Sequence, residues 1–287
     1  MILLTGTTGT VGRHLLGYMP TDQPFRVLAR EPERVEGVPR AARVVRGDYG
    51  DRRSLAVALD GVRTAFLVTN RIGDDDRSFL RAARRAGVRR VVKLSAAAVA
   101  DRQADDLITR WQRTSEGLLR TSGMEWTLLR PRSFMSNALS WASSVRGERV
   151  VRALYGGAAN ACVDPRDVAE VAARALTEDG HAGRVHTLTG PEALTTIEQT
   201  AQLGEVLGRR LRFEGLSRQQ ARGALLERYP ADVAEALLDS AERMRQGAKA
   251  GVEGTVERLL GRPPGSFRGW AAAHRAAFAA PVERVGC

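Results

Sequence analysis

The strongest constraint on the fold of this chain is a glycine-rich loop near its amino terminus. Residues 5–12 (TGTTGTVG) directly follow a short apolar run and open a helical pattern, which places the glycines between a strand and a helix. Gly6 allows a tight turn out of the strand, Gly9 lets the backbone approach a pyrophosphate, and Gly12 lets the helix pack closely on the sheet. Because the free amides at the start of the helix attract phosphate groups, this arrangement predicts a bound nucleotide cofactor. The residues expected to hold it are Gly6, Thr7, Thr8, Gly9, Thr10, Val11 and Gly12.

Apolar runs alternate with helical patterns through the first two-thirds of the chain. Strands are expected at residues 2–4, 25–29, 42–45, 64–68, 88–95 and 126–129, with helices between them. Short buried strands that are joined by helices form right-handed crossovers and a parallel sheet covered on both faces. The sequence therefore predicts a doubly wound α/β fold. Residues 1–131 are expected to form a Rossmann core, and residues 132–287 to supply the remaining core elements (about 164–190) and a small, mostly helical C-terminal lobe for the substrate.

The composition and charge of the chain limit the classes of partner that it can have. Of the 287 residues, 43% are hydrophobic and 27% are charged, which is typical of a globular protein with a sizeable core. Arginine and lysine together outnumber the acidic residues by 44 to 33, giving a net charge of +11, yet only two of the basic residues are lysines. The arginines are scattered among acidic residues, whereas a nucleic-acid-binding face concentrates its charge on one helix or stripe. We therefore expect a solvated basic surface and no nucleic-acid partner.

Nothing in the sequence indicates a membrane span, a secretion signal or a metal. No apolar stretch approaches the roughly 18 residues that a membrane span requires. Strand-like sequence begins at residue 2 with no leader before it, so we expect a cytoplasmic protein. The two cysteines, Cys162 and Cys287, provide neither a disulfide framework nor a cluster of metal ligands, and no metal is expected.

The ends of the later strands indicate which cofactor binds. An NAD site usually presents a carboxylate about 20 residues beyond the glycine loop. Here Arg30 occupies that position and Arg13 directly follows the last glycine of the loop, and guanidinium groups can hold a 2′-phosphate bidentately. We therefore predict NADPH rather than NADH. Asp48 is a candidate to bind the adenine amino group, and Thr69 and Asn70 to line the pyrophosphate and ribose, although each also fits ordinary turn chemistry at a strand end.

Several segments together resemble the NmrA-like, atypical short-chain dehydrogenases/reductases. The resemblance rests on the glycine loop, residues 28–30 (LAR), residues 122–131 (SGMEWTLLRP), residues 164–168 (DPRDV) and the closing residues 261–267. It implies NAD(P)H on a Rossmann domain and a substrate under the C-terminal lobe. Members of the family include quinone and ketone reductases, and also redox-sensing regulators without demonstrated turnover.

The Tyr-x-x-x-Lys pair of ordinary short-chain dehydrogenases is absent, because none of the four tyrosines has a lysine four positions later. Only Ser95 matches a catalytic position of the family, and it is also a candidate cofactor contact. The alkoxide formed from a ketone needs a proton quickly, whereas the reduced oxygen of a quinone is a weak base that water can protonate. Three alternatives stay open: quinone reduction, carbonyl reduction assisted by Ser95, water or the substrate, and no chemistry.

The substrate is expected near residues 133–137, which follow the sixth strand at the carboxyl edge of the sheet. The candidate substrate residues are Trp111, Gln112, Phe134, Met135, Asn137 and Tyr155. The aromatic and apolar side chains among them suit a flat aromatic small molecule such as a polyketide-like metabolite. Such side chains also commonly form the packing of a C-terminal lobe. The first hypothesis is an NADPH-dependent reductase of a quinone or ketone. The alternative is a non-catalytic, NADP-binding, redox-sensing regulator that binds a protein partner.

Overall fold

A computed structural model describes residues 1–279 of the chain, so Cys287 lies outside the described residues. Its central feature is a seven-stranded sheet, with strand order β3-β2-β1-β4-β5-β6-β9, in which every neighbouring pair is parallel. The strands are β1 Ile2–Thr5, β2 Phe25–Ala29, β3 Ala42–Arg46, β4 Thr64–Leu67, β5 Arg90–Leu94, β6 Glu125–Pro131 and β9 Arg184–Leu188. The order runs outward from β1 in both directions, which is the topology of a doubly wound fold. The predicted fold class is confirmed.

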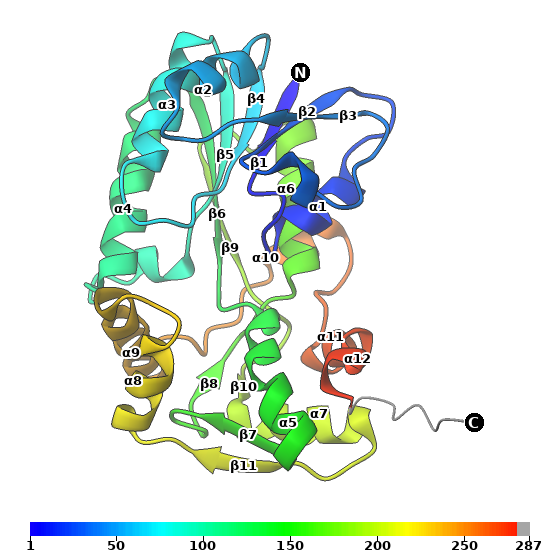
Figure 1. The fold of residues 1–287 in the computed structure, drawn as a ribbon, viewed down its shortest axis with the longest axis vertical. Coiled ribbons are helices and arrows are strands. Elements are labelled where there is room, and N and C mark those ends of the chain that lie inside the picture. The colour runs from blue at the N-terminus through cyan, green and yellow to red at the C-terminus, as the bar shows by residue number, and fades with distance from the viewer. Residues whose placement is uncertain (280–287) are drawn as a thin grey trace. The chain divides into compact units, whose positions relative to one another are not determined.

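Helices cover both faces of the sheet (Figure 1). The contacts among α1, α6 and α10 form one layer, and those among α2, α3 and α4 form the other. These helices are α1 Gly12–Tyr18, α2 Arg52–Leu59, α3 Asp75–Arg85, α4 Leu107–Arg120, α6 Pro165–Thr177 and α10 Thr255–Leu260. Short 3-10 turns lie at η1 Pro32–Arg34 and η2 Ala97–Ala100.

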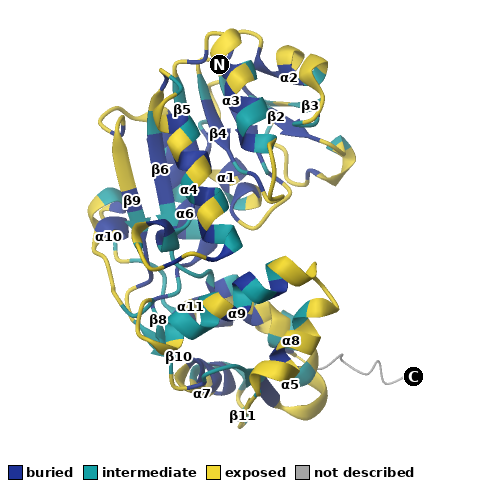
Figure 2. Cartoon of the chain, turned by 90° about the vertical axis from the view of Figure 1, so that its left-hand side faces the viewer, coloured by how far each residue is buried: buried dark blue, intermediate teal, exposed yellow. Residues whose placement is uncertain are grey.

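One hydrophobic core of this part of the molecule lies between the sheet and the second helical layer. Leu3 and Leu128 from the strands pack with Leu55, Phe79 and Leu119 from α2, α3 and α4, and all five side chains are buried. Figure 2 shows that strands β4, β5 and β6 are largely buried, whereas the outward-facing turns of the helices are exposed. Apolar burial on this scale is the main favourable term in folding, and it holds the strand ends that carry the candidate site.

The chain divides into two compact units. Unit 1 contains residues 1–132, 165–188 and 254–263, and unit 2 contains residues 133–164 and 189–253 and the described residues from 264 onward. Helix α10 therefore belongs to unit 1, although its sequence position suggested the C-terminal lobe. The physical reason is that α10 buries Val256 and Leu260, while the Arg174 guanidinium of α6 donates hydrogen bonds to the carbonyl oxygens of Leu259 and Leu260.

Unit 2 is mainly helical but also contains two short strand pairs that were not predicted. Strand β7 (Val150–Ala153) runs parallel to β11 (Arg212–Gly215), and β8 (Ala159–Asn160) runs antiparallel to β10 (Leu194–Thr195). Its helices are η3 Met135–Trp141, α5 Ala142–Glu148, α7 Thr196–Leu207, α8 Arg218–Leu226, α9 Ala231–Arg245, α11 Phe267–Ala273 and α12 Arg275–Phe278. Its own core is centred on the buried Trp270, whose ring stacks on His274 with 4.4 Å between centroids. Within the described residues, no helix combines the length and apolarity needed to span a membrane.

Two buried histidines lie next to each other in unit 1. His181 Nδ1 is 3.1 Å from His186 Nε2, and the Thr127 hydroxyl donates a hydrogen bond to the carbonyl oxygen of His181. Burial and the neighbouring imidazole lower the pKa of His186 to about 4, and burial also lowers the pKa of His181. The folded state therefore holds both rings neutral at neutral pH.

This pair predicts a loss of stability in mild acid. Because the pKa of His186 is lower in the folded state than in the unfolded state, its contribution is complete above about pH 6.5 and declines as the pH falls toward 4. The free energy of unfolding should fall by about 1–2 kcal/mol between about pH 7.5 and about pH 5. Urea denaturation at both pH values measures this difference, which should shrink in His186→Gln and persist in His274→Gln. An unchanged difference in His186→Gln would contradict the assignment.

Candidate active site

The glycine loop forms the tight turn that its sequence predicts. Gly6 has a φ of +67°, in the left-handed region that favours glycine, and its carbonyl oxygen accepts a hydrogen bond of 3.0 Å from the Gly9 amide. A Cβ atom on Gly12 would lie 2.2 Å from the Gly6 oxygen and 2.6 Å from Thr7 Cα. The start of α1 can therefore pass this close to the turn only with glycine at position 12.

The surroundings of the loop fit a nucleotide cofactor. The Thr5 hydroxyl donates to the carbonyl oxygen of Phe66 and accepts from the Val68 amide, each at 2.9 Å, which fastens the end of β1 to β4. Thr7 is buried, and its hydroxyl has no hydrogen-bond partner among the described residues. Because buried hydroxyls are normally paired, the Thr7 hydroxyl is a candidate ligand contact in this cradle.

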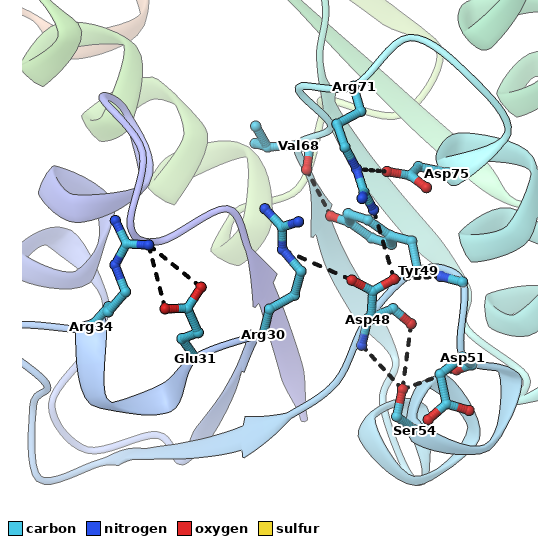
Figure 3. Close-up of polar contacts among 11 residues, drawn as sticks. Arg30, Glu31, Arg34, Asp48, Tyr49, Asp51, Ser54, Val68, Arg71 and Asp75 are labelled. Atoms are coloured by element: carbon cyan, nitrogen blue, oxygen red, sulfur yellow. Dashed lines mark hydrogen bonds and ion pairs between the residues drawn. The ribbon is translucent and has the colours of Figure 1, made fainter.

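Arg30 and Asp48, predicted separately from two strand ends, lie side by side (Figure 3). Arg30 Nε is 3.9 Å from one carboxylate oxygen of Asp48, and Arg71 Nη2 is 3.7 Å from the other. Arg71 also contacts Asp75 at 3.3 Å. Arg71 was missed by the sequence analysis, although its position directly after the candidate Asn70 was a usable signal. The Arg30 and Arg71 side chains are each about half exposed, so their guanidinium groups are accessible to an anionic ligand.

The remaining cofactor candidates are spread around these groups. Arg13 Nε donates a hydrogen bond of 3.3 Å to the Gly9 carbonyl oxygen, and Arg13 is exposed. Thr69 is buried, whereas the neighbouring Asn70 is exposed. Arg34, which lies close to Arg30 in the sequence but is not among the predicted site residues, forms an exposed ion pair with Glu31 at 3.4 Å. The structure thus brings Arg30 and Asp48 together and leaves Arg34 with a local partner.

Ser95 is held by a buried ion pair. Its hydroxyl donates a hydrogen bond of 2.6 Å to Glu116 Oε1, and the Arg130 guanidinium binds the same carboxylate at 2.8 and 2.5 Å. Ser95 and Glu116 are both buried. The hydroxyl proton of Ser95 is therefore directed at a carboxylate, and the geometry makes Ser95 an oriented hydrogen-bonding group.

A second buried ion pair lies beside it on β5. Lys93 Nζ is 2.7 Å from Asp76 Oδ1, and both side chains are almost completely inaccessible to solvent. Asp76 Oδ2 accepts hydrogen bonds from the hydroxyls of Thr69 at 2.8 Å and Ser115 at 3.0 Å. Asp76 and Ser115 were not among the predicted site residues. The only sequence signal was Lys93, a charged residue inside an otherwise apolar strand.

Trp111 and Gln112 lie on α4 close to this ion pair. Lys93 Nζ is 5.9 Å from the centroid of the Trp111 ring, which permits a cation–π interaction. Trp111 Nε1 and Gln112 Oε1 are buried and have no partner among the described residues. Buried polar atoms are rarely left unpaired, so both atoms are candidates for ligand contacts.

The four predicted substrate residues of unit 2 do not all lie at the same cavity. Phe134, Met135 and Asn137 line one cavity of about 330 Å³. Tyr155 is not among the residues that line it. The Tyr155 hydroxyl is hydrogen-bonded to Glu242, which raises the pKa of the phenol, and its ring lies 5.8 Å from the Arg245 guanidinium. Within the described residues, no group of three or more His, Cys, Asp or Glu side chains is arranged to hold a metal ion.

A glycine-rich strand–helix turn on a doubly wound sheet, with basic side chains at the following strand ends, defines a dinucleotide-binding protein. Residues 6–179 match the NAD(P)H-binding family, and the chain belongs to that family. The predicted resemblance to NmrA-like, atypical short-chain dehydrogenases/reductases is confirmed.

Relatives of known activity are similar over nearly the whole length of the chain. It is 56% identical over 280 residues to the (4-alkanoyl-5-oxo-2,5-dihydrofuran-3-yl)methyl phosphate reductase of Streptomyces griseus, covering 97% of this chain and 99% of the relative. It is 32% identical to the NAD(P)H azoreductase of Xenophilus azovorans, covering 98% of this chain and the whole relative. Among solved structures, the NADPH complex of the quinone oxidoreductase from Escherichia coli has a TM-score of 0.82 and 27% identity, with coverage of 96% and 100%. The chain is therefore a nicotinamide-dependent reductase of a small molecule, as predicted.

The close approach at Gly12 generates a test of the loop. In Gly12→Ala the added methyl group would lie within van der Waals distance of the Gly6 backbone, so the turn must open and cofactor affinity should fall at least tenfold, by about 1.4 kcal/mol or more. Fluorescence titration with NADPH measures the affinity, and a thermal melt reports whether the fold persists. Gly17→Ala is the matched control on the same helix, because nothing lies within 4 Å of its added Cβ. Equal affinities in the two variants would show that the loop does not carry the cofactor.

Proposed function

We propose that this chain uses NADPH to reduce a carbon–carbon double bond conjugated with two carbonyl groups. The compound named for the Streptomyces griseus relative, which is 56% identical, has a dihydrofuran ring with an oxo group and an alkanoyl group. The ring double bond is conjugated with both carbonyls, so it accepts a hydride readily. A ring of this kind carrying a phosphorylated methyl group is the proposed substrate class, and we propose that it is reduced in the cytoplasm.

The arrangement around Ser95 supports this choice of substrate. The only side chain at the predicted catalytic position donates its hydrogen bond to Glu116, whose carboxylate is also bound by Arg130. A ketone would yield a strongly basic alkoxide that needs a nearby acid. Addition to the doubly conjugated bond yields an enolate with its charge spread over two oxygens, and water can protonate such a weak base.

The residues of the chain then have positioning roles. The bound nicotinamide supplies the hydride. The glycine loop and the strand-end arginines would hold the phosphates of the dinucleotide, and Ser95, whose proton is directed at Glu116, would present its oxygen in one fixed orientation at the end of β5. The proton that completes the reduction comes from water at the carbon between the two carbonyls.

Quinones are a second acceptor class that this chemistry fits. The chain is 30% identical to quinone oxidoreductase 2 of Escherichia coli over 92% of its length. A quinone is flat and conjugated, and its reduced oxygen is also a weak base. The side chains of Phe134 and Trp111 led us to expect a flat aromatic substrate. The proposal keeps the flat shape and widens the class to flat, conjugated hydride acceptors.

The proposal is tested by following NADPH oxidation with four acceptors. The phosphorylated acyl-dihydrofuranone and a quinone such as menadione should be reduced, whereas an aryl ketone and a dihydrofuranone without the alkanoyl group should be at least about 100-fold slower in kcat/KM. Ser95→Ala should slow both good acceptors by about tenfold or less, equivalent to about 1.4 kcal/mol. Ser143→Ala, at an exposed position of α5 in unit 2, is the control. A preference for the aryl ketone, or a thousandfold loss in Ser95→Ala at unchanged cofactor affinity, would overturn the proposal.

The preference for NADPH has its own test at Arg30. Charge-assisted hydrogen bonds to the 2′-phosphate contribute about 1.5–3 kcal/mol each, so Arg30→Asp should weaken NADPH binding at least tenfold. NADH lacks this phosphate and should bind the variant equally well or better. Calorimetric titration of both cofactors measures the ratio. Arg34→Asp makes the same charge change at the neighbouring exposed arginine and should leave the ratio within about twofold of wild type. A wild type without preference would show that Arg30 is only a surface arginine.

A further inference from the structure

The side chain of Gln112 is buried on α4 and makes no hydrogen bond with the described residues. Gln112 exposes 8% of its surface, and its Oε1 atom is fully enclosed without a partner. Its Nε2 atom likewise donates to no described residue. An unpaired buried carboxamide makes the fold less stable than an apolar side chain of the same shape would. Such a group is expected where a ligand completes its hydrogen bonds.

The buried carboxylates at this edge of the sheet are paired, in contrast to Gln112. Glu116, four residues later on α4, accepts a hydrogen bond from Ser95. Asp76 accepts from two hydroxyls and one ammonium group. Gln112 and the indole nitrogen of the neighbouring Trp111 are the exceptions on α4. The chain thus satisfies its buried charges with its own side chains and leaves the neutral carboxamide available.

Gln112 lies beyond the carboxyl end of β5. Helix α4 joins the parallel strands β5 and β6, so it runs back antiparallel to them. Glu116 lies beside Ser95, which directly follows β5, because the two side chains share a hydrogen bond of 2.6 Å. Gln112 is on the same face of α4 one turn earlier and is therefore farther out from the strand end. In doubly wound folds the ligand occupies this space outside the strand ends, and Gln112, Ser95 and the glycine loop all belong to unit 1.

We propose that Gln112 binds the acceptor and that its carboxamide N–H donates a hydrogen bond to a carbonyl oxygen that becomes negatively charged during the reaction. The inference rests on the proposed function, in which a hydride adds to the ring carbon that carries the phosphorylated methyl group. The electron pair of the ring double bond then moves onto the two carbonyl oxygens, and water protonates the carbon between them. A donor already positioned at such an oxygen lowers the barrier. A carboxamide supplies this donor without burying another charge.

The kinetic test replaces Gln112 with methionine, which has a similar length but no hydrogen-bond donor. With the phosphorylated acyl-dihydrofuranone, kcat should fall at least about tenfold in Gln112→Met while KM changes less than about threefold, because the lost hydrogen bond strengthens only as charge develops. Gln112→Glu, which puts an acceptor in place of the donor, should lose at least as much activity. Gln103→Met, at an exposed position before α4, is the control and should keep the wild-type kcat.

Thermal melts separate a ligand contact from a structural role. The melting temperature of Gln112→Met should equal or exceed that of wild type, because the variant removes an unpaired buried polar group. A residue that serves only the fold would instead lower it. A kcat within about twofold of wild type in Gln112→Met, or a loss of activity that accompanies a lower melting temperature in this variant, would overturn the inference.

A binding test needs no turnover and separates failure of this inference from failure of the proposed function. An acyl tetronic acid has an acylated five-membered lactone ring and is ionised at neutral pH, with its charge spread over its carbonyl oxygens. Calorimetry at saturating NADP+ should show that it binds wild type at least about tenfold more tightly than Gln112→Met, whereas a neutral acyl butyrolactone should bind both equally.

The two failures give different results. If tetronate binding depends on Gln112 but the acyl-dihydrofuranone is not reduced, the Gln112 contact stands and the proposed function is wrong. If wild type and Gln112→Met reduce the acyl-dihydrofuranone equally fast and bind the tetronate equally well, the proposed function stands and the Gln112 contact is wrong.

Discussion

The carboxyl edge of the sheet depends on two buried carboxylates that are fully paired. Asp76 of α3 binds Lys93 of β5 and also accepts from Thr69 after β4 and Ser115 of α4. Burying a carboxylate costs several kcal/mol unless its hydrogen bonds are satisfied, and both oxygens of Asp76 are paired. One side chain thus joins two strand ends and two helices, so the surface on which the reductase site is built has a single arrangement.

The second buried carboxylate, Glu116, sets the orientation of Ser95. The Glu116 carboxylate accepts hydrogen bonds from the Ser95 hydroxyl and the Arg130 guanidinium. It therefore keeps the serine hydroxyl in one orientation at the end of β5. Under the proposed function, Ser95 contributes position and polarity to the acceptor, and the reaction produces a weak base that water can protonate. Because the chain lacks a tyrosine–lysine pair to supply a proton, the doubly conjugated acceptor of the proposed function is the kind of substrate that this site suits.

Much of the fold could be predicted because its signals are local. The apolar runs of the strands, the glycine turn and Arg30 at the end of β2 are each readable within a few neighbouring residues. The strand pairs of unit 2 could not be predicted, since β8 and β10 are only two residues long and are held by pairing with distant segments. The packing of helix α10 on α6 was likewise not readable from the sequence, because the two helices lie far apart along the chain.

The sequence by itself determined the doubly wound fold, the nucleotide loop and the absence of a tyrosine–lysine acid, because each follows from residue type and short spacing. Only the tertiary structure decided which polar groups meet. Asp76 and Lys93 are 17 residues apart, and Ser95 and Glu116 are 21 apart, with no periodicity that connects them. The same holds for Arg71 beside Asp48. Asp76 and Glu116 reach their partners because α3 and α4 cross from one strand end to the next, and the position of each crossing is set by packing rather than by local sequence.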